Sequence, residues 1–158
     1  MASLTGAPRL DARPHVGIGP FRLGMSREAV RAVAGEPESV DFFNEDDICA
    51  EHWYFGDGRI EVSFDDDDPL RVSDISALAP GVTLNGVEII GRAVADLRFL
   101  AEQAGLDDLR PDDDFDEMGA CFTSAAHSVM FWVLDDEVVN FTLFPRYDES
   151  GNEPQWPA

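Results

Sequence analysis

Two pairs of residues in this chain, each a cysteine followed by a histidine, could provide ligands for a metal ion. Cys49 precedes His52 by three residues, and Cys121 precedes His127 by six. Thiolate and imidazole are the ligands that Zn²⁺ prefers, and four of them make a structural site. The two spacings differ, however, whereas zinc knuckles place their ligands in tight pairs. We therefore predict buried thiols, partly exposed imidazoles and no bound metal or cofactor, with a Cys₂His₂ zinc site as the alternative.

Two aspartate-rich segments raise the question of a calcium or magnesium site. Asp65–Asp68 is a run of four aspartates, but hard cations need oxygens that converge rather than carboxylates that follow one another in a turn. Asp112–Asp116 has alternate aspartates, as at the start of an EF-hand loop. Glu117 stands where that loop needs glycine, and Thr123 stands where it needs glutamate. We interpret both segments as solvated turns.

Motifs of nucleophilic and phosphoryl-transfer enzymes do not occur in the sequence. There is no Gly-x-Ser-x-Gly, and "GIGPFRLG" places proline and phenylalanine where a phosphate loop needs bare backbone. The chain contains no lysine, so a phosphoryl-transfer site would lack cations. The sequence therefore favours a protein that is not an enzyme.

The charge of the chain is strongly negative. It has 32 acidic residues against 11 basic ones, all arginine, and a formal net charge of −21. Such a chain repels phosphate backbones and anionic lipid surfaces, so we expect no nucleic-acid or membrane partner. The acidity has three possible origins: codon bias with solvated loops, adaptation to high salt, or an acidic surface that binds a basic protein partner.

The location of the protein can be predicted from what the N-terminal segment lacks. "MASLTGAPRLDARPHVG" has no charged region followed by an apolar one, which argues against a signal peptide. No apolar run approaches the roughly 20 residues that cross a bilayer. With two cysteines far apart in sequence, these features predict a cytoplasmic protein with free thiols.

Two helices are predicted from their apolar periodicity and end signals. The first begins after Ser26, a good N-cap, and ends at Gly35. The second spans about Ala93–Ala104 and ends at Gly105.

Strands are predicted between and after the helices. Glu51–Phe64 reads as a hairpin with a type I′ turn at Asp57-Gly58, flanked by Ser39–Phe43 and Leu70–Leu78 as further strands. Ser128–Phe144 reads as a second hairpin that turns at Asp136-Glu137.

These elements predict an internal repeat of helix, acidic loop and hairpin. Gly24 and Gly91 are 67 residues apart at the two helix starts, and Trp53 and Trp132 are 79 apart in the two hairpins. The predicted fold is therefore two-layer α+β, with tandem repeats that form one mostly antiparallel sheet and with both helices on one face. The predicted parts are a flexible tail (1–15), a single α+β domain (16–147, with repeats at about 16–78 and 84–147) and a C-terminal tail (148–158).

The predicted turns divide the hairpin residues between two faces of the sheet, because side chains alternate along a strand. The face beneath the helices takes Trp53, Phe55, Ile60, Val62, Phe64, Trp132, Leu134, Val139, Phe141 and Leu143. The opposite face takes His52, Tyr54, Glu61, Ser63, Phe131, Val133, Asn140 and Thr142.

The segment Gly17–Pro37 resembles the helix opening "G-M-[ST]-x-x-[EQ]-[VA]-x-x-x-x-G-x-P" of the SmpA/OmlA small lipoproteins and of the β-lactamase inhibitor proteins. In the inhibitor family two helix-plus-sheet repeats lie in tandem, and the concave sheet face holds a protein partner. The resemblance covers about twenty residues, and the second copy keeps Gly91 but lacks the "G-x-P" ending. The tail "DESGNEPQWPA" is similar to the acidic tails of bacterial toxin-immunity proteins.

Two functions follow as hypotheses. The first is a non-enzymatic protein-binding module, an inhibitor or immunity protein, because aromatic residues rimmed by polar ones are typical of interfaces. Its predicted contact residues are Tyr54, Glu61, Phe131, Asn140, His52, Ser63 and Thr142. The alternative is a small-molecule-binding protein or enzyme with a pocket around His52, Tyr54 and Glu61. A salt-adapted domain without a partner is the third reading.

Overall fold

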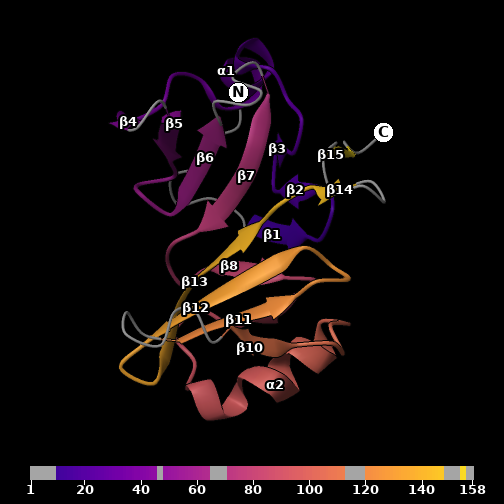
Figure 1. The fold of residues 1–158 in the computed structure, drawn as a ribbon. Helices are drawn as coiled ribbons and strands as arrows, with labels where there is room; N and C mark the ends of the chain where they lie inside the picture. Colours follow the sequence, from indigo (N-terminus) through magenta and orange to yellow (C-terminus); the bar gives the residue numbers. More distant parts are fainter. Residues whose placement is uncertain (1–9, 46–47, 65–70, 113–119, 148–153, 156–158) are drawn as a thin grey trace.

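A computed structural model describes residues 10–45, 48–64, 71–112, 120–147 and 154–155 of the chain. Over these residues the chain forms two helices and fifteen strands, and most of the strands belong to two sheets (Figure 1). Antiparallel pairing predominates, so the α+β class predicted from the sequence is confirmed.

The larger sheet has eight strands in the order β10-β11-β12-β13-β7-β6-β5-β4, and every neighbouring pair is antiparallel. It contains two meanders of four strands, which meet where β7 pairs with β13. The strands are β4 (Ser39–Glu45), β5 (Ile48–Phe55), β6 (Ile60–Phe64), β7 (Val72–Ala77), β10 (Arg110–Asp112), β11 (Ala120–Ser124), β12 (Val129–Leu134) and β13 (Glu137–Leu143).

The smaller sheet has the order β3-β2-β1-β8-β9, and its β1–β8 pair is parallel. Its strands are β1 (Leu10–Arg13), β2 (Gly17–Ile18), β3 (Phe21–Arg22), β8 (Val82–Leu84) and β9 (Val87–Glu88). A separate pair joins β14 (Arg146–Tyr147) to β15 (Pro154–Gln155).

The prediction of a flexible tail over residues 1–15 is wrong for its last part. Leu10 and Ala12 are buried on β1, where the parallel pairing with β8 ties the segment into the sheet. Residues 1–9 lie outside the described residues. Within the predicted C-terminal tail, the two described residues belong to β15.

Both helices begin and end close to the predicted residues. α1 (Arg27–Ala34) is capped by Ser26, whose Oγ accepts a hydrogen bond from the Ala29 amide at 3.1 Å. It ends at Gly35, which has a φ of 79° that favours glycine. α2 (Val94–Gln103) is longer by two residues, and the helices lie toward opposite ends of the molecule (Figure 1).

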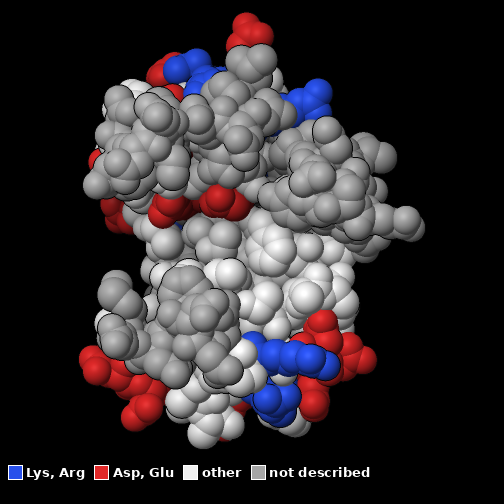
Figure 2. All heavy atoms as spheres, in the orientation of Figure 1, with Lys and Arg blue, Asp and Glu red and all other residues white. Residues whose placement is uncertain are grey.

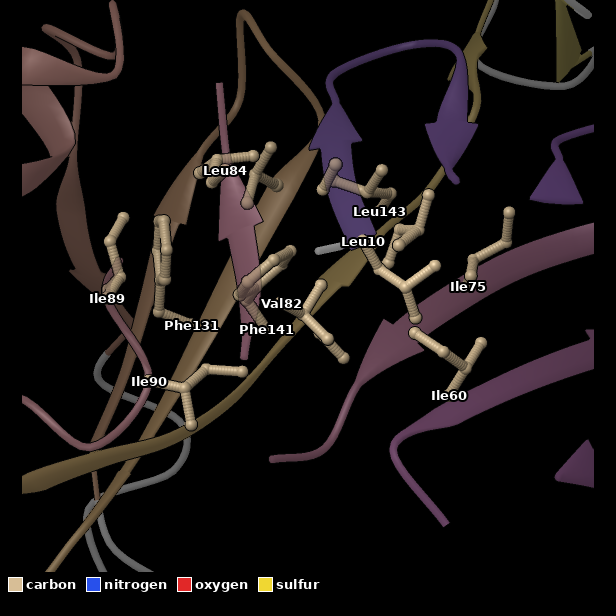
Figure 3. Packing of buried hydrophobic residues seen from close by; sticks show 14 of the residues in the cluster. Leu10, Ile60, Ile75, Val82, Leu84, Ile89, Ile90, Phe131, Phe141 and Leu143 are labelled. Carbon is tan, nitrogen blue, oxygen red and sulfur yellow. The ribbon is translucent and has the colours of Figure 1, made fainter. Parts of the chain in front are cut away.

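The hydrophobic core lies between the two sheets. Side chains from β1 and β8 pack against the larger sheet, as Figure 3 shows for Leu10 and Val82 beside Phe141 and Ile75. Both helices add buried side chains to the same cluster, Val30 from α1 and Leu97 and Ala101 from α2. The smaller sheet, whose strands were not predicted from the sequence, therefore supplies part of the layer expected from the helices.

The first hairpin has the predicted turn and register. Asp57 and Gly58 have φ of 61° and 81°, as a type I′ turn requires at both central positions. Phe55 lies opposite Ile60, and Trp53, which is buried, lies opposite Val62. The three predicted core residues on β6, Ile60, Val62 and Phe64, are also buried.

The second hairpin turns one residue earlier than predicted. Its central residues are Asp135 and Asp136, with φ of 51° and 64°, so Leu134 lies opposite Glu137. A shift of one residue moves every side chain of a strand to the other face. The face predictions for β12 are therefore wrong: Phe131 and Val133 are in the core, Trp132 is half-buried on the opposite face, and Leu134 is 53% exposed.

A β-bulge explains why the same error does not extend along β13. Val133 lies opposite Val138 and Trp132 lies opposite Asn140, so Val139 is an extra residue on β13. Val139 is half-buried rather than part of the predicted core. Beyond the bulge the alternation returns to the predicted phase, and Phe141 and Leu143 are buried as expected.

Truncating Phe131 tests the corrected face directly. We expect Phe131→Ala to lower the free energy of unfolding by about 3–5 kcal/mol, because it leaves a cavity between the sheets. Leu134→Ala is the matched control on the same strand and should change it by less than about 0.5 kcal/mol. Urea unfolding of both variants measures the difference. A larger loss of unfolding free energy for Leu134→Ala than for Phe131→Ala would contradict this assignment and support the face predicted from the sequence.

Candidate functional site

The face of the larger sheet that points away from the core, called the outer face below, carries most of the predicted site residues. In the view of Figure 1, β8 lies behind β12 and β13, so this face is toward the reader. Cross-strand neighbours form a row over six strands, in which successive side chains are about 5 Å apart. From β5 to β11 the row is Tyr54, Glu61, Ser76, Thr142, Met130 and Thr123.

Tyr54 lies between two carboxylates on this face. Its hydroxyl donates a hydrogen bond to Asp41 Oδ2 at 3.2 Å, and Glu61 is its direct neighbour on β6. Burial of the phenol, the negative charge of Glu61 and the contacts with Asp41 together raise the pKa of Tyr54 from its ordinary 10.0 to about 12. The phenol therefore stays neutral and serves as a hydrogen-bonding aromatic group.

His52, Glu61 and Ser63 form one hydrogen-bonded cluster beside Tyr54. His52 Nδ1 lies 2.9 Å from Glu61 Oε1 and 2.8 Å from Ser63 Oγ. Because a carboxylate only accepts, Nδ1 carries the proton in this arrangement. A Ser-His-acid relay instead needs serine and carboxylate on different ring nitrogens. The cluster fixes the imidazole but does not activate Ser63, which is buried.

The structure brings together the predicted site residues of the first half and separates one of the second half. Tyr54, Glu61, His52 and Ser63 are cross-strand or diagonal neighbours on the outer face. Thr142 and Asn140 lie on the outer face of β13. The predicted placement of Phe131 on this face is wrong, because its side chain is fully buried in the core. The turn at Asp135 and Asp136, one residue earlier than predicted, moves it there.

Sequence reasoning missed several outer-face residues. Ser76 is one of them, and its hydroxyl shares a hydrogen bond of 2.7 Å with the hydroxyl of the predicted residue Thr142 at the junction of the two meanders. Met130 and Trp132 occupy the outer face of β12, where the sequence placed Phe131 and Val133. The Asp135-Asp136 pair, which tolerates positive φ at both positions, was the signal that could have set this register.

A second cluster joins the segment between α2 and β10 to the turn between β11 and β12. Asp108 accepts hydrogen bonds from the Ser124 hydroxyl and, at 2.9 Å, from the Ala126 amide. These bonds, with Ser124 first, lower the pKa of the Asp108 carboxyl. His127 Nδ1 also contacts Ser124 Oγ at 2.9 Å. Ser124 is buried, and the cluster's evident role is to fasten this turn.

The arrangement of the histidines does not suit the zinc alternative. His52 lies on β5 and His127 follows β11, and four strands separate β5 from β11, so the two imidazoles are about 20 Å apart or more. The side chain of Cys121 is buried, and the side chain of Cys49 lies outside the described residues. Among the described residues no three potential ligands gather at one point. The calcium candidates at Asp65–Asp68 and within Asp112–Asp116 likewise fall on side chains that are not described.

Charge is unevenly distributed over the surface seen in Figure 2. Uncharged atoms gather over the part of the face formed by β11, β12 and β13, and acidic residues border them. Of the described helices, neither has the length and apolar character needed to cross a membrane.

Comparison with known proteins adds no relative: no family model, no curated protein and no solved structure matches this chain.

The ionisation of Tyr54 provides a test of the site's electrostatics. The difference in ultraviolet phenolate absorbance between the native protein and Tyr54→Phe should give a midpoint near pH 12 rather than 10.0. Because the folded pKa is the higher one, its contribution to stability is complete below pH 10.0 and is lost as the pH rises toward about 12. Asp41→Asn should lower the midpoint. An unshifted midpoint in the folded protein would contradict the described surroundings of Tyr54.

Proposed function

We propose that this chain is a non-enzymatic protein-binding module of the inhibitor or immunity-protein kind, whose outer face binds a basic protein partner. The observation that carries the proposal is the row of side chains across β5 to β11, in which Tyr54 stands next to Glu61 and within hydrogen-bonding distance of Asp41. A half-buried aromatic residue with fixed polar neighbours is the usual anchor of a protein interface.

The charge of the chain indicates the kind of partner. At a net charge of −21, the protein attracts cationic surfaces and repels nucleic acids and anionic lipids. Such attraction raises the rate of association more than it raises the affinity. We therefore propose a basic protein as the partner and neither nucleic acid nor membrane.

We also propose that the two meanders are copies of one tandem unit, as in the inhibitor proteins that the helix opening resembles. Support comes from the pairing of β7 with β13, where Ser76 lies opposite Thr142. Thr142 follows Ser76 by 66 residues, and the same interval relates Ile75 to Phe141 and Ala77 to Leu143. A rotation that carries each of these β7 residues onto its equivalent in β13, and the reverse, turns the pair Ile75–Leu143 into the pair Phe141–Ala77. A two-fold axis between the strands requires this exchange.

The contacts of the helix starts repeat in the same way. Val72 exchanges backbone hydrogen bonds of 2.9 Å with Gly24 and Met25, and Val138 makes the corresponding bonds with Gly91 and Arg92. Both meanders also carry a bulge on their last strand, at Ser73 in one and at Val139 in the other. In this arrangement β5–β6 corresponds to β11–β12, not to β12–β13. The interval of 79 residues between Trp53 and Trp132 therefore joins strands that do not correspond.

The pocket hypothesis around His52, Tyr54 and Glu61 receives less support. These residues do lie together, but the shared contact of Glu61 and Ser63 with one nitrogen of His52 suits a fixed surface group better than a proton relay. We also propose a cytoplasmic location, which suits a chain with only two cysteines that lie far apart in sequence.

Replacing Tyr54 tests the proposed function. A partner is first captured from a lysate of the source cells, identified and purified. Tyr54→Ala should then weaken its binding by about 1–3 kcal/mol, because the anchor of the interface is lost. Isothermal titration calorimetry measures the affinity, and thermal unfolding checks that the variant folds.

Phe99→Ala is the matched control. Phe99 is an aromatic residue of α2 that is 61% exposed and lies away from the outer face. Its removal should leave the affinity unchanged. Equal losses for the two variants, or a loss for Phe99→Ala alone, would place the interface elsewhere.

A further inference from the structure

We infer that the outer face is divided into two receptor halves of different chemistry, so that a partner docks in one orientation, with a cationic side chain over β5–β7 and an apolar one over β11–β13. This inference rests on the proposed function and specifies the chemistry of its partner. It depends on a comparison of positions that the two meanders share.

The register of the sheet defines which positions correspond. Ser76 and Thr142 form the central pair, and their next neighbours outward are Glu61 on β6 and Met130 on β12. The bulge on the last strand of each meander falls at the same point, so the correspondence continues on both sides of it. The remaining outer-face pairs are Tyr54 with Thr123, His52 with Cys121, Ser63 with Trp132 and Asp74 with Asn140.

Corresponding positions share a backbone environment but differ in chemistry. In the first meander, they hold two carboxylates, Glu61 and Asp74, together with an imidazole and a phenol. In the second, Met130 and Asn140 replace the carboxylates, and no side chain of the set is charged at neutral pH. Because sheet geometry is the same at both places, the fold itself does not require either set.

The two halves therefore favour different groups. Trp132 and Met130 are half-buried neighbours whose large, polarisable side chains suit an apolar or aromatic contact. Glu61 and Tyr54 offer a carboxylate and an aromatic ring, which together suit a guanidinium or ammonium group. At the far end of the row Arg110 lies beside Thr123, and its positive charge disfavours the binding of a cation there. Figure 2 shows the uncharged part of this surface over β11–β13.

A titration of the full chain with two small probes tests the division. The probes are N-acetyl-arginine methylamide and N-acetyl-leucine methylamide, and two-dimensional NMR follows the backbone amides of the outer face. The arginine probe should shift Tyr54 and Glu61 at least threefold more than Met130 and Asn140. The leucine probe should give the reverse order. Equal shifts in both halves with the arginine probe would overturn the inference.

Substitutions that exchange the side chains of corresponding positions test the division while the acidic loops stay unchanged. Met130→Glu places a carboxylate at the position equivalent to Glu61, and should extend the shifts from the arginine probe to β12 and β13. Glu61→Met should reduce those at Tyr54 at least threefold. Backbone chemical shifts outside the substituted strands show whether each variant keeps its fold. A Met130→Glu variant that folds but gains no response from the arginine probe would also overturn the inference.

Failure of the division and failure of the proposed function give different results. If Tyr54→Ala weakens partner binding while the probes do not distinguish the halves, the face is an interface but the division is wrong. If the two probes bind to different halves but neither Tyr54→Ala nor Trp132→Ala affects partner binding, the proposed function is wrong. The inferred docking orientation is then wrong as well.

Discussion

The pairing of β7 with β13 is the constraint on which the rest of the structure depends. It joins two meanders, each of which would otherwise end in an unpaired strand edge at the centre of the larger sheet. Its three residue pairs set the phase of side chains on both strands, so that Ile75 and Phe141 enter the core while Ser76 and Thr142 face outward. The remaining strands of the larger sheet take their register from β7 or β13, directly or through a neighbouring strand. The junction therefore determines which residues make up the outer face.

The same junction allows the two halves to differ. The core side of each meander must fill the space against the smaller sheet and the helices, and it is apolar in both halves. The outer face lacks that requirement, and there the halves differ at nearly every corresponding position. Glu61 and Met130 illustrate the contrast, since each lies next to the central pair on its own side. A surface with two chemistries is thus compatible with the proposed repeat of one backbone unit.

Local signals in the sequence predicted the elements that local chemistry determines. Asp57-Gly58 fixed the first hairpin, and Ser26 and Gly35 fixed the ends of α1. Asn85-Gly86 is an equally good type I′ turn, with φ of 48° and 81°, but the strands around it are too short to be evident. The parallel partner of β1 lies about 70 residues away, so no local pattern could indicate it. The outer face of β12 was assigned wrongly because adjacent Asp135, Asp136 and Glu137 offered two turns that differ by one residue.

The most direct test of the central claim is native-state hydrogen exchange of the backbone amides in β7 and β13. If the junction organises the sheet, the amides of Val72–Ala77 and Glu137–Leu143 that bond across it should be among the slowest to exchange, and they should open together. Their exchange free energies should also fall equally when Phe141 is replaced by alanine. Independent exchange, with β13 opening while β7 stays protected, would show that the two meanders are separate units and would contradict the account.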